Sequence, residues 1–450
     1  MKKDLTTGPV KDSIVGLVIP IVSSSLLLFA YNFADILWVG QLGSDAIAAV
    51  GTMAIFLSFC WAIISVFLFG SNIIVSQSIG KQNNKQAQEL AQQAFIGVIG
   101  LTAIIQILIF WQHENIISFF QLNNPVVEKM AKAYLIWSGV EMIFSFMIQQ
   151  MTSVSNARGD AKTPLKINLI GVGLNIILDP IFMFGFDLGV EGAAIATFIS
   201  RFIAFVLFWR RSGIEFYGCK CVWIFNLKDY INVLKIGFPP SIQRVMFTLV
   251  GIFMARIVAH WGSEAIAAQK IGLQIESMTF MLVNGLSGAM LSFTGQNFGA
   301  QKFERIQKGY ISTLQFGSIF GVVMGAVFFL FPEFFVKWFL SDPKAVNIAV
   351  SYLQIIGISQ FLMCIEMITT GVVNGLGKTE IPAAINVVFT VIRVPMAYLF
   401  AYTLDFGING VWLSIAISTF LRAIAITIAY VLIKKKIFIS EKKSLQTVSF

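Results

Sequence analysis

The chain contains an internal duplication that runs from its first apolar segment to its last. Residues 43–50 read Gly-Ser-Asp-Ala-Ile-Ala-Ala-Val and residues 262–269 read Gly-Ser-Glu-Ala-Ile-Ala-Ala-Gln, so six of eight positions are identical at an offset of 219. An offset of 219 or 218 also pairs Pro20 with Pro239, Gln77 with Gln296, Gly80 with Gly299, Gln82 with Gln301, Asn156 with Asn374, Gly159 with Gly377, Asp187 with Asp405 and Gly189 with Gly407. A single shift held over this length indicates two copies of one unit of about 220 residues, and such a repeat determines the architecture.

The composition indicates that the duplicated chain lies in a membrane. Apolar residues make up 57% of the sequence and charged residues 12%, whereas about 25% of a soluble domain is charged. Twelve apolar segments are long enough to cross a hydrocarbon core of ~30 Å as helices, at 14–39, 46–76, 92–111, 131–153, 165–184, 191–209, 231–259, 264–296, 309–331, 350–371, 381–403 and 411–433. Six fall in each copy, so both copies have the same orientation. We therefore expect an all-α membrane protein with twelve transmembrane helices in two six-helix lobes, related by a pseudo-two-fold axis along the membrane normal.

Basic residues predict the orientation of the chain. With the N-terminus inside, the inner loops and tails hold 22 Lys and Arg residues and the outer loops hold 4. The positive-inside rule then places both termini in the cytoplasm. The expected domains are an N-terminal lobe over 1–210, a cytoplasmic linker over 211–230 and a C-terminal lobe over 231–450 with a basic cytoplasmic tail. Because this bias accounts for the net charge of +9, nucleic acid is not an expected partner.

Several classes of function are disfavoured by what the sequence lacks. The first apolar stretch runs to about 25 residues without a small-residue cleavage site, so it is interpreted as a spanning helix and not as a signal peptide. Cys60 and Cys364 lie in apolar segments and Cys219 and Cys221 in the inner linker, which is not a disulfide framework. The sequence shows no Ser-His-Asp set, phosphate-binding loop or cluster of metal ligands. We therefore expect that the protein is not an enzyme and that it has no catalytic residue, no metal and no cofactor.

Acidic residues within apolar segments are functional candidates, because a charge is unfavourable inside a bilayer. Asp35 lies about five residues below the outer end of the first span, roughly 8 Å at 1.5 Å per residue, and Asp179 is equally deep in the fifth. Thr197 lies about six residues into the sixth span. Tyr31 and Asn175 each precede one of the acids by four residues and so share its helix face. These five residues are predicted to form one proton- or cation-coupling site.

The two acids are expected to take up and release a proton. Two carboxylates at one depth in a low-dielectric cavity cannot easily both be ionised. The alternative is a structural polar cluster that joins three helices. The second copy acts as a control, because Met254 and Ala397 occupy the positions of Asp35 and Asp179 there. The loss of both acids, while scaffold residues persist, favours ion coupling confined to the N-terminal half.

The second half carries its own acids within apolar segments, Glu276 and Glu366. Each is a candidate for contact with a cationic substrate or a second ion. Each could instead pair with Arg393 or Arg244, which the sequence favours slightly.

Proline and methionine residues supply further candidates. Pro20 and Pro239 occupy equivalent positions near the start of each copy, where a proline removes a helix hydrogen bond and permits a kink. Pro20 is thus a candidate hinge of the first helix, with an ordinary packing kink as the alternative. Met278 and Met281 are candidates for substrate contact, because flexible, polarizable thioethers suit a promiscuous surface.

Together these residues resemble the multidrug and toxic compound extrusion (MATE) transporters. The resemblance covers essentially the whole chain. It is carried by Pro20, the run Asp35-Ile-Leu-Trp-Val-Gly-Gln-Leu-Gly43, Gln77 with Gly80, Asn156 with Gly159, and Asn175-Ile-Ile-Leu-Asp-Pro180. The acid in the first helix and the Asn-x-x-x-Asp-Pro run in the fifth are similar to the DinF-like prokaryotic branch.

The resemblance also implies which ion is coupled. The DinF-like branch is regarded as using residues that match Asp35, Tyr31, Asn175, Asp179 and Thr197 for proton coupling, with sodium argued for at the same place. A second branch has acids in helices 7 and 10, where this chain has Phe247 and Met363. A sodium site in the C-terminal lobe is therefore not expected.

The function that follows is that of a secondary antiporter. The resemblance implies a monomer in the cytoplasmic (inner) membrane of a prokaryote that exports amphipathic or cationic small molecules by alternating access, driven by a proton gradient. The alternatives are sodium-coupled multidrug efflux and a flippase for a lipid or lipid-linked sugar in the same superfamily. A channel fits less well, because a pore lines its whole length with polar groups.

Overall fold

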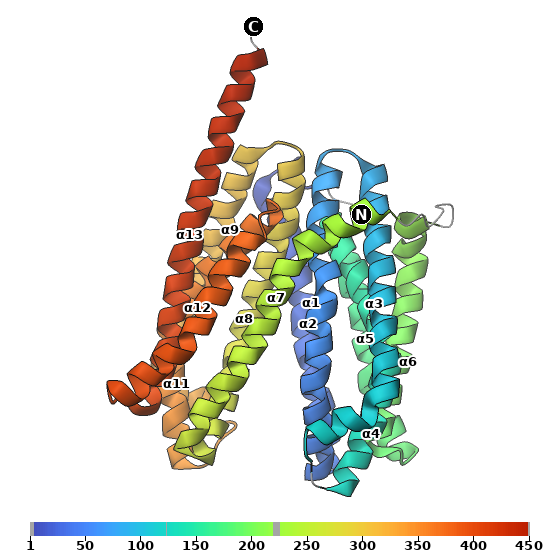
Figure 1. The fold of residues 1–450 in the computed structure, drawn as a ribbon, viewed down its shortest axis with the longest axis vertical. Helices are drawn as coiled ribbons and strands as arrows, with labels where there is room; N and C mark the ends of the chain where they lie inside the picture. Colours follow the sequence, from blue (N-terminus) through green and yellow to red (C-terminus); the bar gives the residue numbers. More distant parts are fainter. Residues whose placement is uncertain (1–3, 123, 219–225, 449–450) are drawn as a thin grey trace. The chain divides into compact units, whose positions relative to one another are not determined.

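The computed structural model describes residues 4–122, 124–218 and 226–448, and nearly all of them are helical (Figure 1). The predicted inner linker lies partly outside this range, and so do its cysteines, Cys219 and Cys221. The elements in chain order are α1 (Val10–Gln41), α2 (Ser44–Gly80), α3 (Asn84–Phe119), α4 (Pro125–Ala157), α5 (Lys162–Pro180), η1 (Ile181–Gly185), α6 (Gly189–Phe208), η2 (Trp209–Gly218), α7 (Leu227–Val258), η3 (Ala259–Trp261), α8 (Ser263–Gly299), α9 (Phe303–Leu330), α10 (Pro332–Val336), α11 (Pro343–Gly375), α12 (Glu380–Tyr398), η4 (Leu399–Thr403) and α13 (Gly407–Val448).

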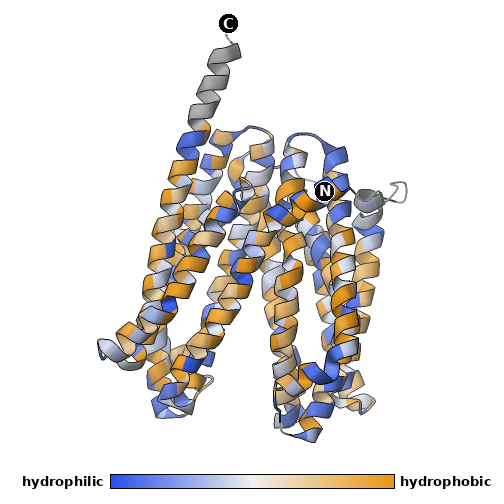
Figure 2. Cartoon of the chain, in the orientation of Figure 1, coloured by the Kyte–Doolittle hydropathy of each residue, from blue (hydrophilic) through white to orange (hydrophobic). Residues whose placement is uncertain are grey.

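The long helices match the predicted membrane spans. Within the described residues, eleven helical segments are long and apolar enough to cross a bilayer, and each coincides with one predicted span. The predicted span at 264–296 corresponds to α8, 37 residues long, whose mean hydropathy is lowered by polar residues such as Glu276 and Asn284. Figure 2 shows hydrophobic residues along the helices and hydrophilic residues concentrated near their ends. The chain therefore has the fold of a multi-pass membrane protein.

The duplication predicted from sequence is visible in the backbone. Non-glycine residues seldom adopt a positive φ, yet the two copies do so at equivalent places with nearly equal angles: Gln82 at 59° and Gln301 at 60°, Asp187 at 55° and Asp405 at 56°. The glycines Gly159 and Gly377 likewise have φ of 77° and 79°. The π-helical turns η1 and η4 are also 218 residues apart. The same local structure is thus used twice.

The chain packs into two compact units. The first comprises Met1–Ile242 with Ser292–Phe303, and the second comprises Gln243–Leu291 with Glu304–Phe450. In the first unit α2 packs against α3 and α4, α4 against α6, and α5 against α1 and α6. In the second unit α11 and α12 both pack against α13.

Within the first unit, the end of α2 meets the end of α8 backbone to backbone. A Cβ atom added to Gly80 would lie 1.9 Å from the carbonyl oxygen of Gln296, and one added to Gly299 would lie 2.0 Å from that of Gln77. The two glycines are equivalent residues of the two copies, and so are the two glutamines. Small residues allow membrane helices to approach closely, so this contact explains why glycine stands at both positions.

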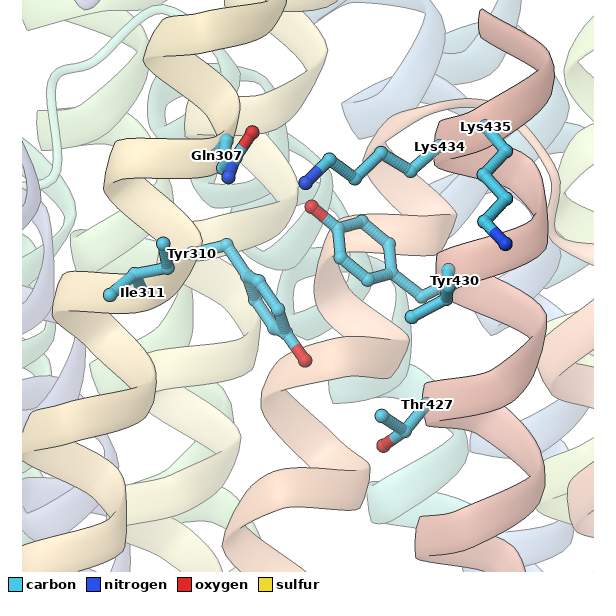
Figure 3. Close-up of a pocket in the computed structure, with 8 residues that line it drawn as sticks. Gln307, Tyr310, Ile311, Thr427, Tyr430, Lys434 and Lys435 are labelled. Carbon is cyan, nitrogen blue, oxygen red and sulfur yellow. The ribbon is translucent and has the colours of Figure 1, made fainter. Parts of the chain in front are cut away.

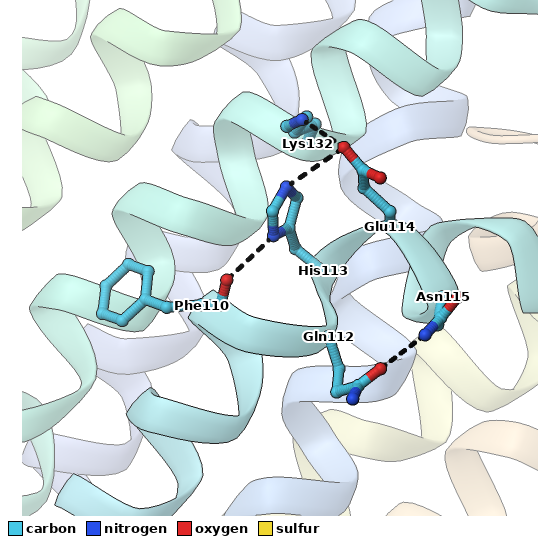
Figure 4. Close-up of polar contacts among 6 residues, drawn as sticks. All are labelled: Phe110, Gln112, His113, Glu114, Asn115 and Lys132. Atoms are coloured by element: carbon cyan, nitrogen blue, oxygen red, sulfur yellow. Dashed lines mark hydrogen bonds and ion pairs between the residues drawn. The ribbon is translucent and has the colours of Figure 1, made fainter.

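Polar groups join the end of α3 to the start of α4 (Figure 4). The Nζ of Lys132 donates a hydrogen bond of 3.0 Å to Glu114 Oε1, and the His113 Nε2 lies 3.7 Å from the same oxygen. The Nδ1 of His113 lies 3.0 Å from the carbonyl oxygen of Phe110. Exposed ion pairs of this kind contribute little to stability. His113 is thus part of a polar cluster near a helix end.

Candidate functional site

Asn175 is the centre of a hydrogen-bonded chain in the first unit. Its Nδ2 donates to Asp179 Oδ1 at 3.1 Å, one turn along α5, and to Thr197 Oγ1 of α6 at 3.2 Å. An amide nitrogen carries two hydrogens, so both bonds form at once. The Thr197 hydroxyl also lies 3.4 Å from the hydroxyl of Tyr31 on α1. Four of the five residues predicted for the coupling site therefore meet, and they come from three helices.

The direction of these bonds follows from Thr197. Its hydroxyl donates its single hydrogen to the carbonyl oxygen of Ala193 at 3.0 Å. It can then only accept from its other neighbours. Tyr31 is consequently the donor in its contact with Thr197, as Asn175 is. The threonine oxygen thus links α1 to α5 by accepting one hydrogen bond from each.

Asp35, the fifth residue predicted for the coupling site, lies beside these four hydrogen-bonded residues. It is close enough to interact electrostatically with both Asp179 and Tyr31. It is six residues before the end of α1, and Asp179 is six residues before the end of η1. The two acids are thus equally far from their helix ends, as the sequence predicts.

The two α5 residues of this hydrogen-bonded chain are deeply buried, and each has one oxygen without a hydrogen-bond partner. Asp179 is 0% and Asn175 1% exposed, whereas Asp35, Tyr31 and Thr197 are half-buried. Within the described residues, Asp179 Oδ2 and Asn175 Oδ1 are buried and have no hydrogen-bond partner. Other buried side chains of the described residues also have polar atoms without a partner, and each such group requires an explanation. The carboxylate oxygen of Asp179 can accept a proton, and both oxygens can contribute to binding a cation.

Arg201, which has no role among the predicted site residues, lies next to the hydrogen-bonded residues. Its guanidinium carbon is 5.2 Å from the ring centroid of Tyr31. It also interacts electrostatically with Glu141 on α4, which accepts a hydrogen bond of 2.6 Å from Ser145. A signal for Arg201 was available, because it follows Thr197 by four residues and so shares its helix face.

Pro20 is buried inside α1 but is remote from the hydrogen-bonded residues around Asn175. It precedes Asp35 by 15 residues, or roughly 22 Å along the helix. A hinge there would act on the orientation of the outer part of α1 and not on the hydrogen bonds directly.

In the second unit the acid Glu366 has a different partner from those expected. Its Oε2 lies 3.7 Å from Nη2 of Arg422 on α13, and both side chains are buried. The sequence suggested Arg393 or Arg244 instead. Arg393 does interact electrostatically with Glu366, but it is not its ion-pair partner. The choice depends on α11 packing against α13, which residue spacing along one helix does not reveal.

The other predicted substrate contacts of the second unit have mixed surroundings. Glu276 Oε2 accepts a hydrogen bond of 2.7 Å from the Tyr352 hydroxyl. Met278 is 49% exposed and Met281 is half-buried. In the part of the chain that the structure describes, no group of three or more His, Cys, Asp or Glu residues could hold a metal ion.

Comparisons with known proteins identify the family. The MatE family model matches residues 20–181 and again 239–399, at the same offset as the internal repeat, which confirms the duplication. The chain is 28% identical over 435 residues to a protein described as probable multidrug resistance protein NorM of Thermotoga maritima, with 92% of this chain and 90% of that protein covered. It is 25% identical over 449 residues to the multidrug export protein MepA of Staphylococcus aureus, with 98% and 97% covered.

Solved structures show the same fold. A transporter of the MOP superfamily from Pyrococcus furiosus superposes with a TM-score of 0.90 at 23% identity, covering 96% of this chain and 98% of that one. The MATE transporter VcmN of Vibrio cholerae superposes with a TM-score of 0.87 at 22% identity, covering 94% and 97%. With one family model matched twice, over most of both halves, the chain belongs to the MatE family of multidrug and toxic compound extrusion transporters.

Proposed function

We propose that the protein is a proton-coupled antiporter, of the DinF-like branch, that exports amphipathic or cationic small molecules by alternating access. The two lobes are residues 1–210 and 231–450, with 211–230 as the linker between them. Its relatives named for multidrug resistance and export support this substrate class. The excess of basic residues in alternate loops supports a cytoplasmic location for both termini. We assign the protein, as a monomer, to the cytoplasmic membrane of a prokaryote.

The observation that carries the coupling assignment is the buried chain around Asn175. An ionised Asp179 offers only acceptors, and its Oδ2 is buried without a donor. A proton bound there would neutralise the charge and turn this oxygen into a donor. The neighbouring Asp35 makes double ionisation unfavourable, because like charges repel strongly in a low-dielectric site. Taking up one proton therefore relieves both the desolvation and the repulsion.

Protonation is expected to move α1. Tyr31 and Asp35 lie on α1, while Asn175 and Asp179 lie on α5, so a change in charge at the acids alters the attraction between two helices. Pro20, inside α1, provides a place at which the helix can bend. A ligand shifts a conformational equilibrium only by its differential affinity for the two states. Competition of proton and exported cation for these acids would supply that difference.

Sodium is the second candidate for the coupled ion, and one observation favours it. Hard cations prefer carboxylate, amide and hydroxyl oxygens, and the unpaired Asp179 Oδ2 and Asn175 Oδ1 are such ligands. The same residues would then bind Na⁺ in place of a proton.

Of the substrate candidates, Met278 is exposed, whereas Glu276 and Glu366 contact other protein side chains.

The test is transport by the purified protein in proteoliposomes with a fluorescent cation as substrate. We expect a pH gradient to drive uptake and a sodium gradient to drive little. Asp179→Asn and Asp35→Asn should abolish gradient-driven uptake, since asparagine keeps the shape of the side chain but cannot take up and release a proton. The matched controls are Ala397→Ser and Met254→Ala, at the equivalent positions of the second copy, which should retain activity.

Two results would refute the assignment. Full uptake driven by a sodium gradient alone would replace the proton with Na⁺ at this site. Equal losses in the first-copy variants and in their second-copy controls would show that the polar chain serves packing, because helix packing affects both copies alike.

A further inference from the structure

A pocket of about 440 Å³ lies between α9 and α13 in the second unit, apart from the proposed coupling site (Figure 3). Its walls include Gln307, Tyr310 and Ile311 from α9 and Tyr430, Val431 and Lys434 from α13. Antiport as proposed above uses none of these residues. The pocket therefore needs an explanation of its own.

Two tyrosines form a fixed inner wall. The rings of Tyr310 and Tyr430 are 4.5 Å apart between centroids at 55°, and Tyr430 is 6% exposed. The Thr369 hydroxyl donates to the carbonyl oxygen of Ile365 at 2.6 Å, so Tyr310 is the donor in its own 2.9 Å contact with Thr369. This bond fixes the Tyr310 ring from behind. The wall is thus formed before any ligand binds.

Polar groups gather at one end of the pocket. Figure 3 shows the Lys434 ammonium, the Tyr430 hydroxyl and the Gln307 amide pointing toward one another, whereas Lys435 points away. Lys434 follows Tyr430 by one helical turn, which places both on the same face of α13. An ammonium, a hydroxyl and an amide can each donate to a phosphate oxygen. This end matches an anionic phosphate group.

The other side of the pocket is apolar and exposed. Ile311 is 46% and Val431 43% exposed, on helices that we assign to the bilayer. Such residues suit an acyl chain and are not needed to bind a free phosphate ion. The pocket therefore combines a cationic end with an apolar wall, as an amphipathic ligand requires.

The depth of Lys434 agrees with a lipid headgroup. It lies 27 residues after Gly407, the first residue of α13, or roughly 40 Å along the helix. A hydrocarbon core is about 30 Å thick and a bilayer with headgroups about 40–45 Å. Lys434 is thus at the level of the headgroups at the end of α13 opposite to Gly407.

We propose that this pocket binds an anionic phospholipid, with the phosphate held by Lys434, Tyr430 and Gln307 and an acyl chain lying along Ile311 and Val431. Basic pockets between membrane helices on the cytoplasmic side recognise anionic headgroups. The orientation proposed above places the pocket in the cytoplasmic leaflet. Lys308, Lys435 and Lys436 are additional cations of α9 and α13 near this end, and Glu304 is an acid of α9 near the same end.

Native mass spectrometry of the full-length protein tests the proposal, with palmitoyl-oleoyl phosphatidylglycerol and phosphatidylcholine as probes. We expect tighter binding of phosphatidylglycerol to the wild type. Lys434→Gln should weaken that binding by roughly tenfold or more, because Lys434 lines the pocket and the variant loses a charge-assisted hydrogen bond to the phosphate. Lys434→Arg should retain it. Lys436→Gln is the matched control, because it removes the same charge from the same helix outside the pocket, and it should have little effect.

A competition arm separates a lipid from a soluble phosphate. Glycerol 3-phosphate carries the same headgroup phosphate without acyl chains, and millimolar concentrations should fail to displace phosphatidylglycerol. If glycerol 3-phosphate displaced phosphatidylglycerol and bound as tightly as the lipid does, the proposal would be overturned in favour of a soluble phosphate. Equal losses from Lys434→Gln and Lys436→Gln, or equal binding of phosphatidylcholine and phosphatidylglycerol, would also overturn it. These readouts do not depend on transport, so they stand whether or not the coupling assignment holds.

Discussion

Gly80→Ala should destabilise the first unit because the new methyl group has no space. The added Cβ would lie 1.9 Å from the carbonyl oxygen of Gln296, whereas ordinary contacts of this type begin at 3.4 Å. The gap is about 1.5 Å too short. The obstructing atoms are backbone and cannot rotate away, since the amide nitrogen of Ala300 would also lie 3.0 Å from the added methyl carbon. The ends of α2 and α8 must therefore move apart.

The expected magnitude follows from overpacking. Forcing extra atoms into a packed interface typically costs about 1–3 kcal/mol. Alanine recovers up to about 1 kcal/mol of helix propensity relative to glycine, so the net loss is smaller than the clash alone. For a unit of this size each kcal/mol corresponds to about 2–4 °C in Tm. With a net loss of about 1–2 kcal/mol, we expect Gly80→Ala to lower the melting temperature by roughly 2–8 °C.

The assay is thermal unfolding of the purified protein in detergent, followed by intrinsic tryptophan fluorescence. Gly100→Ala is the matched control, because it makes the same chemical change in a helix where a Cβ would meet nothing within 4 Å. It should leave the melting temperature unchanged or raise it slightly. A Gly80→Ala protein as stable as this control would show that α2 and α8 do not approach this closely, and the steric argument would fail.

Two further experiments test charged residues inside the long helices. Glu366→Ala leaves the Arg422 guanidinium buried without its partner at 3.7 Å, so we expect a loss of roughly 3–5 kcal/mol in stability. The double variant Glu366→Met with Arg422→Met removes both charges and should lose clearly less. Thermal unfolding of the two proteins decides, and a double variant as destabilised as Glu366→Ala would contradict the pairing. Arg201→Gln removes the cation 5.2 Å from the Tyr31 ring, and a contact of this kind contributes about 0.5–2 kcal/mol. We therefore expect efflux of a fluorescent cation, normalised to expression, to fall several-fold. Unchanged efflux would assign Arg201 to packing alone.

The elements of the fold were predictable because their signals are local. A run of apolar residues longer than about 18 identifies a membrane helix by its own composition, and all twelve predicted spans fall on long helices. The repeat offset, likewise, needs only a comparison of the chain with itself. What the sequence did not show is where a helix changes its hydrogen-bond pattern, as in η1 and η4. Those π-helical turns depend on how the following segment packs, as Gly192 does against the backbone of Phe182.

The polar chain was predictable only as far as spacing along one helix extends. A separation of four residues placed Asn175 and Asp179 on one face, and the structure joins them by a 3.1 Å hydrogen bond. The hydrogen bond from Asn175 to Thr197 joins two helices. Its prediction depended on an estimate of how deep each residue lies in the membrane. The partner of Glu366 was missed for the same reason, because several arginines lie in neighbouring helices and only the packing selects Arg422.

The difference between the two copies supports a functional role for the hydrogen-bonded residues around Asn175. Both copies share the same turns and the same unusual φ angles, so their equivalent positions have comparable backbone surroundings. Asp179 of the first copy corresponds to Ala397, which is also fully buried, and Asn175 corresponds to Arg393. That arginine donates from Nε to Ser418 at 3.0 Å and interacts electrostatically with buried acids of other helices. A permanently charged arginine among acids can hold helices together, but it cannot exchange a proton near neutral pH. A carboxyl with an unpaired oxygen can, so at these equivalent positions the second copy carries a fixed charge and the first copy carries the group that we propose to titrate.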